Sequence, residues 1–315
     1  MSTATTKPAF VNVTQAPNRI KGSCTALITP FKDGKVDAVG FQRFVDWQIA
    51  QGTDGLVPVG TTGEAPTLSH DEHRQVIELC VSAAKRRVPV IAGAGSNSTD
   101  EAVELSRFAK SVGADATLHS TGYYNKPTQE GLYLHFKAIN DAVDLPFIVY
   151  NVPVRTIVDI SAGTMARIAE LKHFAGIKDA TANMARHSQH RQLFNRSYAA
   201  LSGEDSTALG YNAHGGTGCI SVTSNIAPKL CAEFQAACAA SDYRKALTLH
   251  DQLMPLHDAL FIETNPAPVK YAAWRLGLID NPDCRLPLAP LTEPTKKAVD
   301  AALAKVGLLS TQAAE

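Results

Sequence analysis

Short apolar runs of strand length alternate along most of this chain with segments that repeat apolar residues at helical spacing. Residues 39–49, for example, place Phe41, Phe44, Val45 and Gln48 on one face of a predicted helix. The apolar runs predict eight strands, at residues 23–31, 54–60, 88–95, 114–121, 145–151, 174–180, 198–204 and 216–222. Because helices separate them, the strands are expected to be parallel. Eight units of even length favour a closed (β/α)8 TIM barrel over an open doubly wound sheet.

The pattern changes after residue 240, where helical segments follow one another without an intervening strand. These segments are predicted at residues 242–260, 269–278 and 292–308. We therefore expect a (β/α)8 barrel over residues 21–240 and a C-terminal helical region over residues 241–315. Residues 1–20 are polar and lack a period, so we interpret them as an N-terminal tail.

Two helix starts carry the signature of a capping box, in which a serine and a glutamate three residues later bond to each other's backbone. Ser69 with Glu72 is one such pair, and Ser98 with Glu101 is the other. We expect a helix to begin directly after each of these serines.

Composition narrows the classes of function. The chain has 30 basic and 30 acidic residues and no basic block, so a nucleic-acid partner is not expected. The first ten residues lack the apolar core of a secretory signal, and no apolar run is long enough to cross a bilayer. The six cysteines form no C-x-x-C pair, which is typical of reduced thiols. We therefore expect a cytoplasmic protein without a membrane partner.

Barrel enzymes carry their active sites on the loops that follow the strands. Polar candidates for one shared site follow four of the predicted strands: Thr61, Thr62, Tyr123, Tyr124, Tyr150, Arg155 and Lys178. Arg155 is always charged, so it suits an anionic substrate, although a surface salt bridge would explain it equally well. Residues 60–64, GTTGE, could present hydroxyls and amides to a carboxylate or form an ordinary turn.

Lys178 interrupts the apolar run at residues 174–181, FAGIKDAT. An ammonium beside a buried strand is costly unless it is paired or loses its proton. A desolvated lysine loses its proton more easily, and the free amine attacks carbonyls. Lys178 is therefore a candidate Schiff-base lysine, whereas a solvated lysine just past a strand is the simpler alternative.

A metal site is not expected. His70 and His73 lie three residues apart at a predicted helix start, but the H-E-x-x-H spacing is absent and no third ligand is evident.

Seven motifs stand out along the chain, in the order GTTGEAPTL, AGAGSNST, YYNKPTQEGLYLHF, LPFIVYNVPVRT, GIKDAT, LSGED and GCISVTSNIAP. This set and its order resemble the dihydrodipicolinate synthase family, and the similarity extends over residues 20–309. The chain therefore resembles the pyruvate-dependent class I aldolases, a superfamily that includes N-acetylneuraminate lyase. The resemblance implies condensation of pyruvate with L-aspartate 4-semialdehyde to 4-hydroxy-tetrahydrodipicolinate, in lysine and diaminopimelate biosynthesis, usually by a homotetramer.

The resemblance also implies roles for the matching residues. Lys178 would form the Schiff base with pyruvate, so no cofactor is needed, and Tyr150 would be the general acid and base. Thr61 and Tyr124 would complete a proton relay with Tyr150, with Tyr124 contributed by a neighbouring subunit. The residues that would hold the substrates are Thr62 for the pyruvate carboxylate, Arg155 for the carboxylate of aspartate semialdehyde, and the main chains of Gly203 and Ile220.

Lysine-inhibited members of the family bind the effector at the tight subunit interface. The residues that match this site are His70, His73, Asn97, Glu101 and Tyr123, with Ala65 where a serine is common. A carboxylate such as Glu101 suits the ammonium groups of L-lysine, although the capping box would give Glu101 a structural role instead.

Three departures from the family pattern bear on this expectation. His119-Ser120-Thr121-Gly122 replaces the usual apolar-Thr-Pro run before the tyrosine pair, and Gly122 could loosen the backbone that aims Tyr124. Ala182 stands where glycine is common, and Glu204 replaces a common aspartate.

Two other functions stay open at this point. One is a different pyruvate-dependent aldolase or hydratase of the same superfamily, although members that act on neutral aldehydes often lack an arginine at the position of Arg155. The other is a catalytically silent ligand-binding homologue.

Overall fold

The structure is a computed structural model that describes residues 19–194 and 196–309. Most of the predicted N-terminal tail, residues 1–20, therefore lies outside the described residues. Across the described ranges, no helix is both long and apolar enough to span a membrane.

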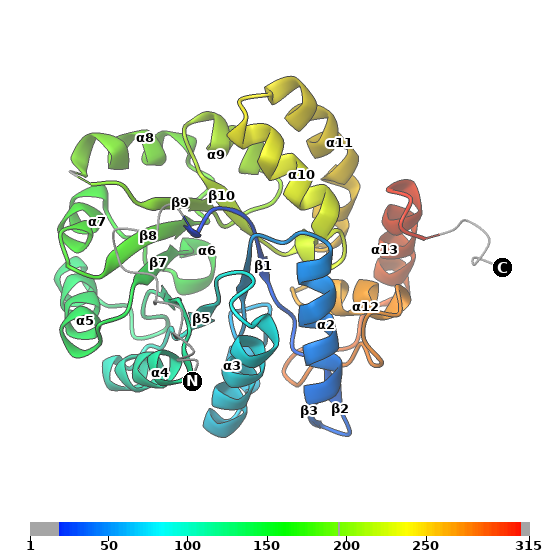
Figure 1. The fold of residues 1–315 in the computed structure, drawn as a ribbon, viewed down its shortest axis with the longest axis horizontal. Helices are drawn as coiled ribbons and strands as arrows, with labels where there is room; N and C mark the ends of the chain where they lie inside the picture. Colours follow the sequence, from blue (N-terminus) through cyan, green and yellow to red (C-terminus); the bar gives the residue numbers. More distant parts are fainter. Residues whose placement is uncertain (1–18, 195, 310–315) are drawn as a thin grey trace, which may run out of the picture.

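Eight parallel strands form the centre of the fold (Figure 1). They are β1 (Gly22–Ala26), β4 (Gly55–Val57), β5 (Ile91–Gly93), β6 (Ala116–Ser120), β7 (Phe147–Asn151), β8 (Phe174–Asp179), β9 (Ala199–Ser202) and β10 (Gly218–Ser221). Their spatial order is β4-β1-β10-β9-β8-β7-β6-β5. Backbone hydrogen bonds from Leu56 to Pro89 (3.0 Å) and from Gly93 to Pro58 (3.0 Å) join β4 to β5 and close the barrel. The predicted (β/α)8 barrel is therefore confirmed.

A ring of helices covers the strands (Figure 1). They are α2 (Ala38–Ala50), α3 (His70–Ala84), α4 (Thr99–Val112), α5 (Gln129–Ala142), α7 (Ala162–Ala169), α8 (Met184–Leu193), α9 (Ala208–Ala213) and α10 (Pro228–Ala239). Short turns of helix follow three strands: η1 (Ala65–Thr67), α6 (Pro153–Thr156) and η2 (Thr223–Asn225). The predicted amphipathic face of α2 is confirmed, because Phe41, Phe44, Val45 and Gln48 are all buried.

Side chains alternate along each strand between the barrel interior and the layer under the helices, since the side-chain period of a strand is two. On β7, Ile148 and Tyr150 belong to the interior cluster, whereas Phe147 and Val149 belong to the outer core. This alternation explains the polar end of β6. His119 faces outward against Phe147, and burial lowers its pKa to about 3, so it is a neutral part of the core.

The first strand is shorter than predicted. It ends at Ala26, although its apolar run continues to residue 31. The Ile28 amide donates to the side chain of Asn225 (3.0 Å) instead of to a neighbouring strand, and Pro30 has no amide proton to donate. Beyond this point the chain forms a separate hairpin of β2 (Phe31–Lys32) and β3 (Lys35–Val36).

One of the two predicted capping boxes is wrong. Ser69 and Glu72 form the expected box at the start of α3. At the start of α4, however, the Ser98 side chain makes no capping bond. Ser96 takes over the local hydrogen bonding, because its hydroxyl accepts from the Ser98 amide (2.9 Å) and donates to Glu101. Glu101 is therefore free of the structural role that capping would have given it.

Three further helices follow the barrel: α11 (Tyr243–Ala259), α12 (Ala267–Arg275) and α13 (Glu293–Lys305). They lie on one side of the barrel, beside α10 and α2 (Figure 1). The segment between α11 and α12 reaches the carboxyl ends of the strands, which brings the C-terminal region into contact with the candidate site.

Candidate active site

Lys178 and Tyr150 lie side by side because they are register partners on the parallel strands β8 and β7. Partners at the same register point to the same face of a sheet, here the barrel interior. The Nζ atom of Lys178 lies 4.1 Å from the centre of the Tyr150 ring, and the lysine is only 7% exposed. Lys178 is therefore not the solvated surface lysine that was the simpler alternative.

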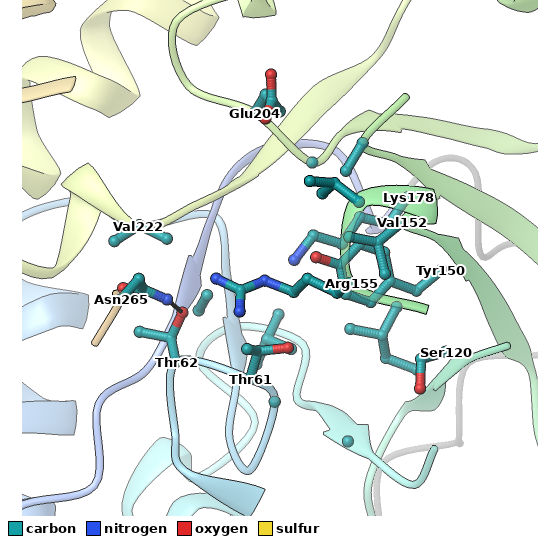
Figure 2. A pocket seen from close by; sticks show the side chains of 18 of the residues that line it. Thr61, Thr62, Ser120, Tyr150, Val152, Arg155, Lys178, Glu204, Val222 and Asn265 are labelled. Carbon is teal, nitrogen blue, oxygen red and sulfur yellow. Dashed lines mark hydrogen bonds between the residues drawn. The ribbon is translucent and has the colours of Figure 1, made fainter. Parts of the chain in front are cut away.

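A cavity of about 540 Å³ opens above this pair at the carboxyl ends of the strands. Five of the predicted site residues other than Tyr150 line it: Thr61, Thr62, Arg155, Lys178 and Gly203. Figure 2 shows the side chains of Thr61, Thr62, Arg155 and Lys178 around one space, although they come from segments that lie far apart in the sequence. The cavity also receives Ser120 from β6, which is the register partner of Tyr150.

The GTTGE loop is held in place from below. The Gly60 carbonyl accepts hydrogen bonds from the amides of Gly63 (3.1 Å) and Ala65 (3.3 Å). Thr29 donates to the Gly63 carbonyl (2.7 Å) from the loop after β1. This bonding closes the loop on itself and leaves the side chains of Thr61 and Thr62 on the wall of the cavity.

Arg155 lies on α6, directly after β7, and its side chain points into the cavity (Figure 2). Among the described residues, no carboxylate lies within ion-pair distance of its guanidinium. The salt bridge that was an alternative explanation for Arg155 is therefore absent from the described part of the chain. An unpaired guanidinium beside a cavity can bind a carboxylate with two parallel hydrogen bonds.

Gly203 and Ile220 differ in their positions. Gly203 lines the cavity, and a Cβ atom there would come within 2.8 Å of the Ala180 Cβ, so only glycine fits. Ile220 is buried on β10 and belongs to the barrel interior cluster below the cavity. Ile220 is not among the residues that line the cavity, so the main-chain role that the resemblance implies for it stays a prediction.

Tyr124 is separate from the other candidates. It is 95% exposed and is not among the residues that line this cavity. Its backbone has a φ of 65°, which is uncommon for a bulky residue and is often found at functional positions. Ala182, another departure from the family pattern, has a φ of 56°, in the left-handed region that favours glycine.

A second cavity of about 440 Å³ adjoins the first. Four of the five candidate effector residues line it, together with Ala65: His70, His73, Glu101 and Tyr123. The fifth, Asn97, lies at its edge, where its amide donates to the Tyr123 carbonyl (3.5 Å). The two cavities share lining residues that include Thr61, Tyr150 and Arg155.

The charges in the second cavity are arranged around Glu101. The His70 Nε2 atom lies 3.4 Å from a Glu101 carboxylate oxygen. Burial, and secondarily the Glu101 charge, raises the pKa of the Tyr123 phenol. Burial lowers the pKa of His73, whose Nε2 lies 2.8 Å from the Gly93 carbonyl oxygen. The cavity therefore presents the Glu101 carboxylate, the polar rings of His70, His73 and Tyr123, and, on the side shared with the first cavity, the Arg155 guanidinium.

Sequence reasoning missed two contributions from the C-terminal region. Asn265, between α11 and α12, lines the first cavity and hydrogen bonds to Thr62. Lys270 on α12 forms a buried ion pair with Glu64, the last residue of the GTTGE loop. Thr62 and Glu64 lie about 200 positions before Asn265 and Lys270, so local patterns could not connect them. The only local signal was a lysine within the apolar helix VKYAAWRLGL.

A (β/α)8 barrel with a buried lysine beside a tyrosine at the strand ends defines a candidate enzyme of the class that binds carbonyl substrates through an amine. Within the described residues, no group of three or more His, Cys, Asp or Glu side chains could hold a metal ion. The chain belongs to the dihydrodipicolinate synthetase family, whose family model matches residues 19–306. The predicted family is therefore confirmed.

Named relatives cover nearly the whole chain. The 4-hydroxy-tetrahydrodipicolinate synthase of Parvibaculum lavamentivorans is 64% identical over 92% of this chain and 99% of its own length. Acinetobacter baumannii dihydrodipicolinate synthase, solved with pyruvate, is 50% identical with a TM-score of 0.89, covering 92% of this chain and 100% of that one. The enzyme of Cyanidioschyzon merolae, solved with lysine bound, is 33% identical with a TM-score of 0.89, covering 95% and 100%. These relatives confirm the expected synthase and its barrel.

Proposed function

We propose that this chain condenses pyruvate with L-aspartate 4-semialdehyde through a Schiff base on Lys178. The observation that carries the proposal is the contact of buried Lys178 with Tyr150 in a cavity that also holds Arg155, which has no carboxylate partner among the described residues. The family membership supports the same substrates. The reaction requires no cofactor, because the lysine imine supplies the electron sink.

The reaction follows from the chemistry of an amine and two carbonyls. The Lys178 amine attacks the keto carbon of pyruvate, and water leaves as the iminium ion forms. Loss of a methyl proton gives an enamine, whose carbon attacks the aldehyde carbon and forms the new carbon–carbon bond. The amino group of the second substrate then attacks the imine carbon, closes the ring and releases Lys178, so that one water leaves per turnover.

Each of these steps moves a proton, which is the role proposed for Tyr150. An unperturbed phenol has a pKa near 10, so a chain of hydroxyls is needed to carry the proton away. Thr61, on the same cavity wall, is the proposed next member of the relay. Tyr124 is the proposed third member and would come from a neighbouring subunit, which its 95% exposure and strained backbone support.

The substrate carboxylates are proposed to bind at opposite walls of the cavity. Thr62 and the main chains of Gly203 and Ile220 would hold pyruvate, while Arg155 would hold aspartate semialdehyde. Fixing both substrates by their charged ends supplies the orientation that a two-substrate condensation needs.

We also propose a homotetramer in a reducing, cytoplasmic compartment. The exposed tyrosines Tyr123 and Tyr124 support an assembly that covers them. All six cysteines are free, and five of them are buried, which supports a compartment without disulfide formation.

The second cavity is the proposed binding site for L-lysine as an effector. Its Glu101 carboxylate suits an ammonium group, and its walls contain Thr61 and Tyr150 of the proposed relay. An effector bound in this cavity would therefore contact Thr61 and Tyr150 of the proposed relay directly.

Two measurements test the proposed function. Sodium borohydride with pyruvate should inactivate the enzyme and leave a reduced adduct on Lys178, identified by peptide mass mapping. Turnover of pyruvate with a panel of aldehydes, coupled to a reductase that consumes the cyclic product, should be fastest with aspartate semialdehyde. Preference for a neutral aldehyde would favour another pyruvate aldolase, and an absence of both adduct and turnover would favour a silent homologue.

A further inference from the structure

The segment between α11 and α12 forms one wall of the candidate active site, although it belongs to the C-terminal region. Residues 261–265 all line the first cavity. Asn265 lies near the end of this segment and is only 5% exposed. Its amide nitrogen donates a hydrogen bond of 2.9 Å to the Thr62 hydroxyl, as Figure 2 shows.

The direction of this hydrogen bond decides what Thr62 can do. A threonine hydroxyl carries one proton and can accept two hydrogen bonds. Because Asn265 is the donor, the Thr62 oxygen acts as the acceptor and its own proton stays free for a carboxylate. If the amide were reversed, the Asn265 carbonyl would accept that proton, and Thr62 would have nothing to donate to pyruvate.

The contact is held by a second connection between the same two segments. Lys270 lies five residues after Asn265 and pairs with Glu64, two residues after Thr62, at 2.7 Å. The Glu64 carboxylate also accepts from the Arg285 amide (2.9 Å). Two bonds between one loop and one helix start fix their relative position, so the amide of Asn265 meets Thr62 in a defined geometry.

The Asn265 carbonyl oxygen is buried and has no hydrogen-bond partner among the described residues. A buried polar atom without a partner costs free energy, so packing alone would favour an apolar side chain here. Asn265 donates a hydrogen bond to Thr62 but leaves its own side-chain oxygen without a partner. This arrangement favours a role for Asn265 in ligand binding over a role in stabilising the fold.

We propose that Asn265 is a positioning residue for pyruvate, which acts through Thr62 by keeping the Thr62 proton available to the pyruvate carboxylate. The proposal rests on the proposed function, since it takes pyruvate as the ligand of Thr62. It extends the site to the C-terminal region, which the motif resemblance did not include.

A double-mutant cycle tests the proposal. Asn265→Ala, Thr62→Val and the double variant are compared for pyruvate KM and kcat, and for the pyruvate concentration that half-saturates borohydride trapping. We expect each single variant to raise the pyruvate KM about tenfold, with a much smaller change in kcat. In the Thr62→Val background, Asn265→Ala should add less than about twofold, because the two side chains act as one unit.

Asn265→Asp provides a second readout. Aspartate has the same shape but can only accept, so it would take up the Thr62 proton and repel the pyruvate carboxylate. We expect it to raise the pyruvate KM more than Asn265→Ala does. Asn265→Ser serves in its place if the aspartate variant does not fold, as judged by its thermal unfolding.

The matched control is Thr292→Val. Thr292 donates to Glu263 from its amide (3.1 Å) and from its hydroxyl (2.8 Å), so the control removes the hydroxyl anchor of the same segment without changing a side chain of the cavity. Its pyruvate KM should stay at the wild-type value. An equal rise in the control would mean that Asn265 only stabilises the segment.

Two outcomes overturn the inference. In the first, the effects of Asn265→Ala and Thr62→Val multiply in the double variant. In the second, Asn265→Asp binds pyruvate as the wild type does. Failure of the proposed function itself gives a different result, which the wild-type enzyme shows before any variant is made. In that case borohydride would trap no pyruvate adduct on the wild-type enzyme.

Discussion

The ammonium of Lys270 lies 2.7 Å from a carboxylate oxygen of Glu64, and their side chains are 0% and 1% exposed. The pair joins α12 to the loop that carries Thr61 and Thr62. Lys270 also lies 4.1 Å from the centre of the Phe31 ring, so its charge is enclosed on several sides. The C-terminal region is therefore bound to the candidate active site through a buried charge.

Removal of one member of this pair should destabilise the protein strongly. Lys270→Met leaves the Glu64 carboxylate buried without its partner, which costs about 3–5 kcal/mol. Urea unfolding measures the loss, and Lys270→Met with Glu64→Gln should recover part of it. Lys296→Met removes the exposed pair with Glu293 and should change stability by less than about 0.5 kcal/mol. Similar losses for both lysines would contradict the buried-charge argument.

Lys178→Ala should fold and lose nearly all turnover. The side chain ends at the cavity, so the truncation leaves the interior cluster below it in place. The variant should unfold in urea close to the wild type and form no borohydride adduct with pyruvate. Lys172→Ala, which alters an exposed lysine, is the control and should keep the adduct. An adduct that persists in Lys178→Ala would show that another amine is the nucleophile.

Arg155→Ala should impair the use of aspartate semialdehyde far more than the binding of pyruvate. A lost charge-assisted hydrogen bond costs about 1.5–3 kcal/mol, which corresponds to about 10- to 150-fold in kcat/KM. Arg155→Lys should recover only part of the loss, because lysine lacks the planar fork. Two quantities are measured for each variant: kcat/KM for the aldehyde, and the pyruvate concentration that half-saturates borohydride trapping. Equal damage to both substrates would indicate a structural role.

L-lysine should inhibit the wild-type enzyme at millimolar concentration and saturating pyruvate. Glu101→Thr should weaken that inhibition, since an effector coupling of about 1–3 kcal/mol depends on the carboxylate. Glu104→Thr makes the same change on the exposed face of α4 and should leave inhibition intact. Wild-type turnover that does not respond to lysine would refute the effector site. Inhibition that survives Glu101→Thr would mean that the site lies elsewhere.

Glu72 should make the stability of the protein sensitive to acid. Hydrogen bonds from Arg285, at 2.6 and 2.5 Å, lower the pKa of Glu72 from 4.5 to about 2. A carboxyl whose pKa is lower in the folded state adds stability above its unfolded pKa, and this stability is lost as the pH falls from about 4.5 to about 2. Glu72→Gln can keep the capping box but not the charge.

The measurement is the free energy of unfolding in urea between pH 6 and pH 2. The Glu72→Gln variant should be less stable than the wild type near neutral pH, and its stability should fall less steeply below pH 4.5. Parallel curves for the two proteins would show that the Arg285 contact contributes nothing that depends on pH.

Much of the candidate site follows from local rules. A strand has a side-chain period of two, and parallel strands end on the same side of a barrel. With Tyr150 and Lys178 at the ends of neighbouring strands, those rules alone predict that the two side chains share one site. The alternation of apolar runs with helical segments likewise determined the barrel, because it recurs eight times with even spacing.

Where the chain offered two local solutions, only the tertiary structure chose between them. Glu101 could have capped its own helix, but Ser96 takes the hydrogen bonds there and Glu101 faces His70 instead. The first strand could have continued to residue 31, but the Asn225 side chain bonds the Ile28 amide. These choices depend on partners that a local pattern does not contain.

The sequence by itself determined the barrel, the side of the barrel that carries the candidate site, and the position of Lys178 on β8, because those depend on periodicity and on residue types close together in the chain. Only the tertiary structure decided how the C-terminal region completes the site. The bonds from Asn265 to Thr62 and from Lys270 to Glu64 join residues that lie 203 and 206 positions apart. Contacts of that separation depend on how α11 and α12 dock against the barrel, and no repeating pattern in the sequence encodes that docking.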